Sequence, residues 1–173
     1  QRDRALLLFA WATGGRRRSE VASAALSNLR RIDADSFLYT LTHSKTNQSG
    51  EVRPQDYKPL VGSAAQAMNA WLQVLRAQGI HAGPVFRRVR RGGHVGEALT
   101  GAAVREIVRE RCALAGVEGE FSAHSLRAGF VTEAGRQNLP LAEPMAMPGH
   151  QSVDTLLDYF RAEAPLAGRA GRL

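Results

Sequence analysis

Apolar residues recur at helical spacing along most of this 173-residue chain, and that periodicity constrains the fold more than any other feature. It predicts helices over residues 4–11, 19–29, 63–78, 100–115 and 124–137, with a short one over 141–147 and a last one after 150. Residues 36–43 are rich in β-formers, and 51–54 are expected to return beside them as the partner strand of a hairpin. We therefore expect an α+β fold, mainly helical, with a small antiparallel β-sheet, in a single domain over residues 1–173.

Glycines and one threonine mark where the predicted segments begin and end. Thr13-Gly14-Gly15 suits a turn after the first helix, and Gly79 and Gly116 end the helices that precede them. Thr100 is expected to cap the helix that follows it. Residues 165–173 are rich in Gly, Ala and Arg, and we expect them to form a loosely ordered tail.

The basic residues are almost all arginine. The chain carries a net charge of +7, and only Lys45 and Lys58 of its 23 basic residues are lysine. Arginine presents a planar fork of donors that matches phosphate oxygens, so this composition favours a polyanionic partner such as double-stranded DNA. A GC-rich coding sequence that favours arginine codons is an equally good explanation of the composition taken alone.

Several classes of protein are disfavoured by what the sequence lacks. A single cysteine, Cys112, excludes an internal disulfide and is expected at a helical core position, and no His/Cys cluster has zinc-ligand spacing. The 16 acidic residues are scattered rather than clustered, which disfavours a two-metal nuclease, so we expect no metal and no cofactor. No stretch approaches 18 apolar residues and no signal peptide is visible, so a cytoplasmic, nucleoid-associated protein without membrane contact is expected.

Two arginines and a histidine sit where they can hold a phosphate. Arg17 lies at the start of the second predicted helix, with Glu20 three residues on, where its carboxylate can hold the Arg17 guanidinium. His124 and Arg127 are spaced so that both side chains leave one side of a helix, a pair that suits a single phosphate. Taken alone, the first segment is also typical of a solvated basic turn, and the second of a simple surface pair.

Three further residues are candidates for proton transfer or nucleophilic attack. Lys45, at the tip of the predicted hairpin, can act as a general acid, although an ordinary turn lysine fits equally well. His150 follows a glycine that allows close backbone approach, and Tyr159 is nine residues further on among apolar neighbours. Taken alone, the histidine also fits a buried, hydrogen-bonded position, and the tyrosine fits a core aromatic. One continuous helix would place His150 and Tyr159 on opposite faces, so their convergence requires a chain break between them.

Taken in order, these residues resemble the catalytic domain of the tyrosine recombinase (phage integrase) family. The Arg-x-Ser-Glu motif after a glycine turn matches Arg17 to Glu20, and the hairpin motif Lys-Thr-x-Gln matches Lys45 to Gln48. The His-x-x-Arg box matches His124 to Arg127, and the Gly-His before the nucleophile matches Gly149-His150, with the family's nine-residue spacing ending on Tyr159. The resemblance covers residues 17–159, and it implies the integrase catalytic fold.

The resemblance also implies a mechanism and partners. Tyr159 would attack the scissile phosphate to form a 3′-phosphotyrosyl link, Arg17, Arg127 and His150 would hold the phosphate oxygens, Lys45 would protonate the 5′-oxygen, and His124 would manage the tyrosine proton. Neither metal nor ATP is needed. Relatives assemble as tetramers on DNA and carry a separate N-terminal DNA-binding domain. The chain begins without Met in a helical stretch, so we expect that an N-terminal part has been cut away.

Other functions of the same fold stay open at this point. A topoisomerase-like relative would use the same chemistry to relax DNA, and a non-catalytic DNA-binding module would keep the fold but lose one of the six residues. Outside the six, we expect sequence-independent phosphate contacts from basic residues of the first turn and of the segment 85–95, namely Arg16, Arg18, Arg87, Arg88, Arg90 and Arg91.

Overall fold

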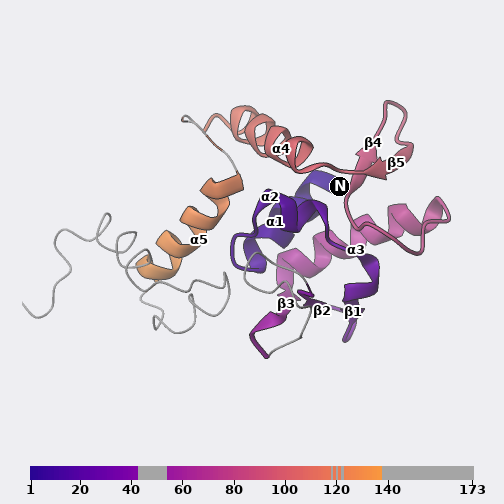
Figure 1. The fold of residues 1–173 in the computed structure, drawn as a ribbon, viewed down its shortest axis with the longest axis horizontal. Helices are drawn as coiled ribbons and strands as arrows, with labels where there is room; N and C mark the ends of the chain where they lie inside the picture. Colours follow the sequence, from indigo (N-terminus) through magenta and orange to yellow (C-terminus); the bar gives the residue numbers. More distant parts are fainter. Residues whose placement is uncertain (43–53, 118, 120, 122, 138–173) are drawn as a thin grey trace, which may run out of the picture.

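The described part of the chain is built in layers. The computed structural model describes residues 1–42, 54–117, 119, 121 and 123–137. A three-stranded antiparallel sheet, in the order β1 (Leu29–Arg31), β2 (Ser36–Thr40), β3 (Tyr57–Val61), forms one side. Helices α1 (Arg2–Ala12) and α3 (Gly62–Ala77) cover it, and α4 (Gly101–Leu114) lies beyond them (Figure 1). This confirms the predicted α+β class with a small antiparallel sheet.

The hydrophobic core lies between the sheet and the two central helices. Phe9 of α1 meets Tyr39 of β2 edge-on, with ring centroids 4.9 Å apart, and also packs against Phe86. Trp71 of α3 is 1% exposed, and its indole Nε1 donates to the carbonyl of Val85 at 2.8 Å. This bond satisfies the polar atom of the buried tryptophan and joins α3 to the chain that leads into β4 (Arg87–Val89).

The second predicted helix is much shorter than expected. In place of one helix over 19–29, the chain forms α2 (Arg18–Ala22), a 3-10 turn η1 (Leu26–Asn28) and then β1. The reason is tertiary: the carbonyl of Ala24 accepts the N–H of Val85 at 2.7 Å, and the N–H of Leu26 donates to Gly83 at 2.9 Å. Backbone bonds to the segment 83–85 therefore replace the bonds that would have continued the helix.

The partner strand of β2 also differs from the prediction. It is β3, paired in register with Phe37 opposite Leu60, and Pro54, the last residue of the predicted strand over 51–54, lies in a 3-10 turn η2 (Pro54–Asp56). Residues 51–53 lie outside the described residues. The N–H of Leu41 donates to the carbonyl of Asp56 at 2.9 Å and joins the two sides of the hairpin stem.

The remaining elements confirm the periodicity. Helices α3, α4 and α5 (Ala123–Arg136) occupy the predicted stretches, and the Thr100 hydroxyl accepts the N–H of Ala103 at 3.2 Å as the expected cap of α4. Cys112 lies on α4 as expected, but it is half-buried and not part of the core. The segment after Val85 forms a hairpin of β4 and β5 (Val95–Ala98) around Gly92-Gly93. The predicted helices over 141–147 and after 150, the tail 165–173 and the hairpin tip at Lys45 lie outside the described residues.

None of the helices in the described ranges combines the length and the apolar character needed to cross a membrane.

Candidate phosphate-binding site

The turn after α1 packs directly against α5. Gly15 has a φ of +68°, and a Cβ at this position would collide with the Cα of Arg127 and lie 2.9 Å from its amide nitrogen. Only glycine combines this left-handed backbone with so close an approach. The contact sets the backbone that leads into Arg17 beside the backbone of Arg127, although the two residues are far apart in the sequence.

Aromatic packing fixes the same pair of helices along their length. Gly129 on α5 leaves room for Trp11, because a Cβ at Gly129 would lie 3.2 Å from the indole ring. The ring of Trp11 meets Phe130 edge-on at 6.0 Å. The His-Ser-Leu-Arg box is therefore carried by a helix that is held against α1 at two points, and these residues determine where Arg127 sits.

Glu20 holds the Arg17 segment differently from the prediction. Its Oε2 accepts the backbone N–H of Arg17 at 3.0 Å, and the same oxygen lies 3.8 Å from Nη1 of Arg16. Its ion pair is therefore with Arg16, and the expected contact between Glu20 and the guanidinium of Arg17 is not among the bonds of the described residues. The Arg17 side chain stays half-buried beside the packed turn.

Arg16 does not fit the role expected of it. Its side chain is 3% exposed, whereas a phosphate contact needs an accessible guanidinium. Burial lowers the pKa of Arg16, while the charges of Glu20 and Asp56 act in the opposite direction. Arg16 therefore belongs to the interior of the site. Arg18 is exposed, and its side chain lies along the start of α4, where a Cβ on Gly101 would be 3.4 Å from it.

Two buried charged residues near Arg16 were not predicted from the sequence. Lys58 of β3 is 2% exposed, and Asp56 in η2 is 8% exposed. Burial, with a further contribution from Arg16, lowers the pKa of Lys58 to about 8. A signal was present in the sequence, because Lys58 shares its strand face with the apolar Leu60, but the strand is expected too early in the chain for this signal to be seen.

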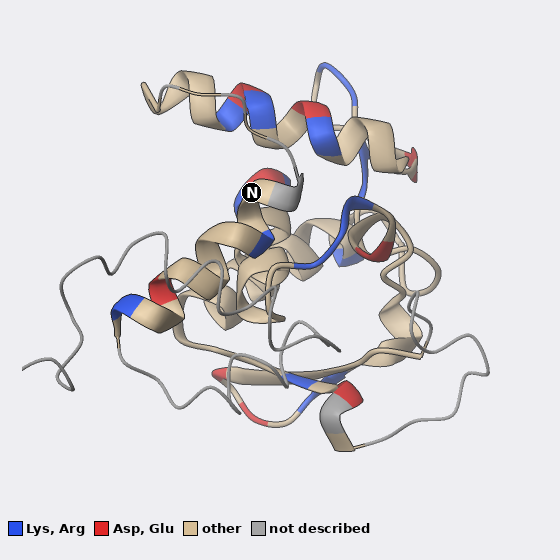
Figure 2. Ribbon diagram, turned by 60° about the vertical axis from the view of Figure 1, so that its left-hand side comes forward, with Lys and Arg blue, Asp and Glu red and all other residues tan. Residues whose placement is uncertain are grey.

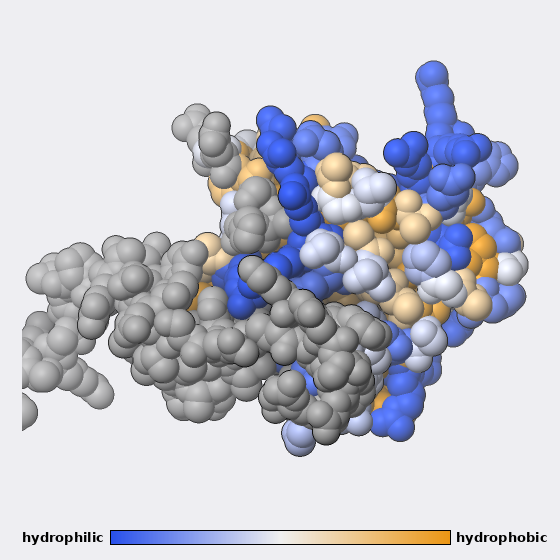
Figure 3. All heavy atoms as spheres, in the orientation of Figure 1, coloured by the Kyte–Doolittle hydropathy of each residue, from blue (hydrophilic) through white to orange (hydrophobic). Residues whose placement is uncertain are grey.

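The basic hairpin of β4 and β5 divides into two kinds of arginine. Arg87 donates to the carbonyls of Ala82, Pro84 and Gly96 at 3.1, 3.2 and 3.4 Å, so it anchors the hairpin, and the expected DNA contact does not fit this arrangement. The other three, Arg88, Arg90 and Arg91, are exposed at the outer edge, where Figure 3 shows hydrophilic residues projecting from the body. In the described ranges, none of these three pairs with a carboxylate.

The turn of this hairpin is hydrogen-bonded to the C-terminal end of α3. The amide of Gln78, the C-terminal cap of α3, donates to the carbonyl of Gly93 at 3.0 Å and accepts the N–H of Val95 at 2.8 Å. Both sides of the turn are thereby fixed to one side chain. The three exposed arginines are therefore held on a fixed support. Figure 2 draws arginine and lysine in blue.

The other predicted site residues are only partly covered by the structure. His124 lies in the first turn of α5, three residues before Arg127, and nothing more of it is described. Lys45, His150 and Tyr159 lie outside the described residues, as does the expected chain break between the last two. Of the other tyrosines, Tyr39 is 3% exposed and burial raises its pKa, whereas Tyr57 is 46% exposed.

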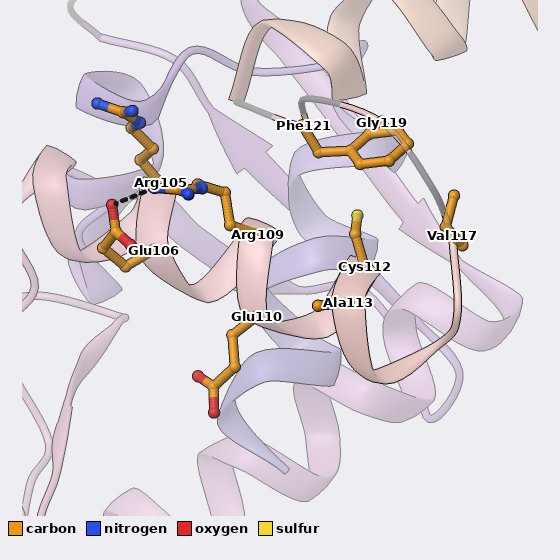
Figure 4. A pocket seen from close by; sticks show the side chains of 9 residues that line it. All are labelled: Arg105, Glu106, Arg109, Glu110, Cys112, Ala113, Val117, Gly119 and Phe121. Carbon is orange, nitrogen blue, oxygen red and sulfur yellow. Dashed lines mark ion pairs between the residues drawn. The ribbon is translucent and has the colours of Figure 1, made fainter.

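A separate cavity of about 760 Å³ lies along α4 (Figure 4). Arg105, Arg109 and Cys112 line it together with Phe121, and Arg109 pairs with Glu106 at 3.5 Å. Of the predicted site residues that the structure describes, none borders this cavity. Nor does any group of three His, Cys, Asp or Glu residues within the described ranges gather as a metal site would require.

Comparison with known proteins agrees with this geometry. The sequence model of the phage integrase family matches residues 1–164. The chain belongs to the phage integrase family. It is 31% identical over 164 residues to an integrase/recombinase xerD homolog from Selenomonas ruminantium, covering 92% of this chain and 47% of that protein. The chain therefore spans about half the length of that curated relative, and the predicted family resemblance is confirmed.

Solved structures of this family share the fold. The XerH site-specific recombinase bound to a palindromic difH substrate, in a post-cleavage complex, has a TM-score of 0.74 at 19% identity and covers 99% of this chain and 45% of its own. A lambda integrase dimer bound to a COC′ core site has a TM-score of 0.62 at 17% identity, covering 95% and 53% of the two chains. At these identities the likeness establishes the fold of this chain and no more.

Proposed function

We propose that this chain is the catalytic part of a site-specific DNA recombinase or integrase. The observation that carries the proposal is the packing of Gly15 on the backbone of Arg127, which draws together the two motifs that supply Arg17 and Arg127. Two arginines at one place can fork onto the non-bridging oxygens of a single phosphate. The match of the family model over residues 1–164 supports the same assignment for His124, Lys45, His150 and Tyr159.

The proposed reaction conserves the phosphodiester bond energy. The hydroxyl oxygen of Tyr159 attacks phosphorus, the bond from phosphorus to the 5′-oxygen breaks, and a 3′-phosphotyrosyl link remains. Lys45 gives a proton to the departing 5′-oxygen, and His124 accepts the proton of the tyrosine. Arg17, Arg127 and His150 stabilise the charge on the phosphate oxygens. A 5′-hydroxyl from a second strand reverses these steps, so the reaction needs no ATP and no metal.

The exposed arginines of the hairpin extend the proposed DNA contact beyond the reacting phosphate. Arg88, Arg90 and Arg91 carry charge on a support fixed by Gln78, and they meet no carboxylate in the described ranges. Such residues bind backbone phosphates and release counterions without reading base sequence. Arg18 is a fourth candidate, beside the start of α4. In the full-length protein we expect further copies of the recombinase on the same DNA.

The decisive experiment is a suicide substrate, a duplex nicked close to the scissile phosphate. The full-length protein is expected to accumulate a covalent protein–DNA adduct in the presence of a chelator, and Tyr159→Phe is expected to abolish it. Tyr57→Phe is the matched control, because Tyr57 is exposed and loses the same hydroxyl. An adduct that survives Tyr159→Phe, or that needs magnesium, overturns the proposal.

Products of an intact substrate separate the related activities. Recombinant molecules formed from two target sites support a recombinase. Relaxed plasmid without recombinants indicates a topoisomerase-like enzyme, and binding without any adduct from the wild-type protein indicates a non-catalytic DNA-binding module.

A further inference from the structure

Four charged side chains form a buried cluster beneath the turn that carries Arg17. Two are cations, Arg16 and Lys58, and two are carboxylates, Glu20 and Asp56, with exposed fractions between 2% and 8%. We call this set the buried charge cluster. Taking four ionised groups out of water is expensive, and a replacement by apolar side chains of similar size is often neutral or stabilising. Stability alone therefore gives no reason for these four residues.

The members of the cluster act on one another electrostatically. Burial lowers the pKa of Lys58, Arg16 lowers it further, and the charges of Asp56 and Glu20 oppose this shift. For Arg16, burial likewise lowers the pKa, with Glu20 and Asp56 opposing and Arg17 adding to the effect. Within the cluster, Nη1 of Arg16 lies 3.8 Å from Oε2 of Glu20, so these two charges are in direct ionic contact. The charge of Arg17 also acts on Arg16. The side chain of Arg17 is the one that is proposed to face the phosphate.

The cluster also joins two parts of the chain that are distant in sequence. Through Glu20 it holds the backbone N–H of Arg17 at 3.0 Å. Through Asp56 it reaches the stem of the β2–β3 hairpin, where the carbonyl of the same residue accepts the N–H of Leu41 at 2.9 Å. The segment that contains Lys45 leaves and re-enters the fold at this stem. A shift in the cluster therefore moves the Arg17 turn relative to the stem.

We propose that the buried charge cluster is a positioning device for DNA strand cleavage, in which Arg16 and Lys58 fix the Arg17 turn and the β2–β3 stem in one relative arrangement. The inference rests on the proposed function, because it needs Arg17 to act on a phosphate. Arg16 and Lys58 are positioning residues: both are buried, and they act through Arg17 and the stem rather than on DNA. A displacement of about 1 Å at a reacting group is enough to slow a reaction on the order of 100-fold.

The test compares cleavage with binding in the full-length protein. Arg16→Met is expected to lower the single-turnover cleavage rate of a suicide substrate by about 10- to 100-fold at saturating DNA, while the Kd for DNA changes less than about 2-fold. Arg16→Lys, which keeps the charge, is expected to recover most of the rate. Arg30→Met is the matched control, since Arg30 is exposed on β1 and takes no part in the site. Rates are normalised to the folded fraction measured by circular dichroism.

A second substitution separates positioning from a general loss of order. In an Arg17→Lys background, Arg16→Met is expected to cost clearly less than it does in the wild-type protein, because the part of its effect that passes through Arg17 is already lost. Full additivity of the two losses overturns the proposal, as does an Arg16→Met protein that cleaves at the wild-type rate. If Arg16→Met does not fold, Asp56→Asn tests the same cluster from the stem, with the same expected loss of rate and unchanged Kd.

The outcome is distinguishable from a failure of the proposed function. If the wild-type protein forms no adduct, the proposed function fails first. If the wild-type protein forms an adduct and both Arg16→Met and Asp56→Asn cleave at its rate, the recombinase assignment stands and the positioning role of the cluster is wrong.

Discussion

The basic residues of two regions, the buried charge cluster and the β4–β5 hairpin, look alike in the sequence and differ in the structure. Arg16 and Lys58 are 3% and 2% exposed and lie among carboxylates. Arg88, Arg90 and Arg91 are exposed, and none pairs with a carboxylate in the ranges that the structure describes. The surroundings of each residue therefore distinguish a positive charge that lies in the interior from one that is accessible to an anionic partner.

The difference also separates two ways of supporting a charge. In the cluster, ionic partners hold the side chains, so removing one partner leaves another charge uncompensated in the interior. In the hairpin, the side chains of Arg87 and Gln78 donate hydrogen bonds to backbone carbonyls and so fix the support, while Arg88, Arg90 and Arg91 are exposed. Substitutions in the first region should change stability and cleavage, whereas those in the second should change DNA affinity.

The largest effect is expected from Glu20→Gln, which removes the carboxylate shared by Arg16 and the Arg17 backbone. The free energy of unfolding should fall by about 3 kcal/mol, because a buried cation loses its partner. Chemical denaturation monitored by circular dichroism measures this change. The control is Glu97→Gln on the exposed hairpin strand β5, for which less than about 0.5 kcal/mol is expected. Equal losses in the two variants would remove the distinction between the regions.

Two glycines, one next to the buried charge cluster and one in the β4–β5 hairpin, test how tightly the backbone is packed. Gly15→Ala should destabilise the protein by more than about 2 kcal/mol, because the new methyl group meets the backbone of Arg127 as well as an unfavourable φ of +68°. Gly93→Ala, at a φ of +85° with nothing within 4 Å, should cost only about 1 kcal/mol. Melting temperatures of the two variants decide the matter, and a Gly15→Ala protein no weaker than Gly93→Ala would contradict the packing.

The pH dependence of stability tests the burial of Lys58. Its pKa is lowered to about 8, mainly by burial, so between pH 8 and about 10.5 the folded state binds fewer protons than the unfolded state. Stability should therefore rise with pH across this window, by up to about 1.4 kcal/mol per pH unit. Lys58→Met should lack that contribution in urea titrations at each pH. If the two proteins show parallel profiles, Lys58 does not titrate as a buried group.

The smallest effect on stability is expected at the hairpin. Replacing Arg88, Arg90 and Arg91 by Gln, singly and together, should change the free energy of unfolding by less than about 0.5 kcal/mol each. DNA binding should weaken equally on all sequences, and the slope of log affinity against log salt should fall by about one for each arginine removed. An unchanged salt slope in the triple variant would exclude these residues from the phosphate contact.

The helices were predictable because helical periodicity and end signals agree. Thr100 and Gly116 bound α4 as expected, and the strongly periodic stretch over 63–78 forms α3. The prediction of one helix over 19–29 was wrong because the backbone there forms hydrogen bonds to residues 83–85. Such a tertiary contact cannot be inferred from local spacing. Likewise the partner strand of β2 is Tyr57–Val61, which the strand predicted over 51–54 does not include, so the buried strand position of Lys58 was not predicted.

The candidate site was predictable in its motifs but not in its surroundings. Arg17 and Arg127 were identified from their neighbours, and the fold brings the backbones that carry them together. Three consecutive arginines, 16 to 18, have the same chemistry in the sequence. Only the geometry of the Gly14-Gly15 turn, with φ of 94° and 68°, sends Arg16 inward while Arg18 faces solvent. The roles of all six residues, Arg17, Lys45, His124, Arg127, His150 and Tyr159, stay predictions.

The bond between the Leu41 N–H and the Asp56 carbonyl has a consequence for how this protein can vary. This bond closes the stem at residues 41 and 56. The number of residues between them therefore does not affect how β2 and β3 pair. Lengthening a closed loop costs only about 0.6 kcal/mol for each doubling. Insertions between residues 42 and 55 should therefore leave β2 and β3 paired as they are, so a change in the length of this segment does not require a change in the fold.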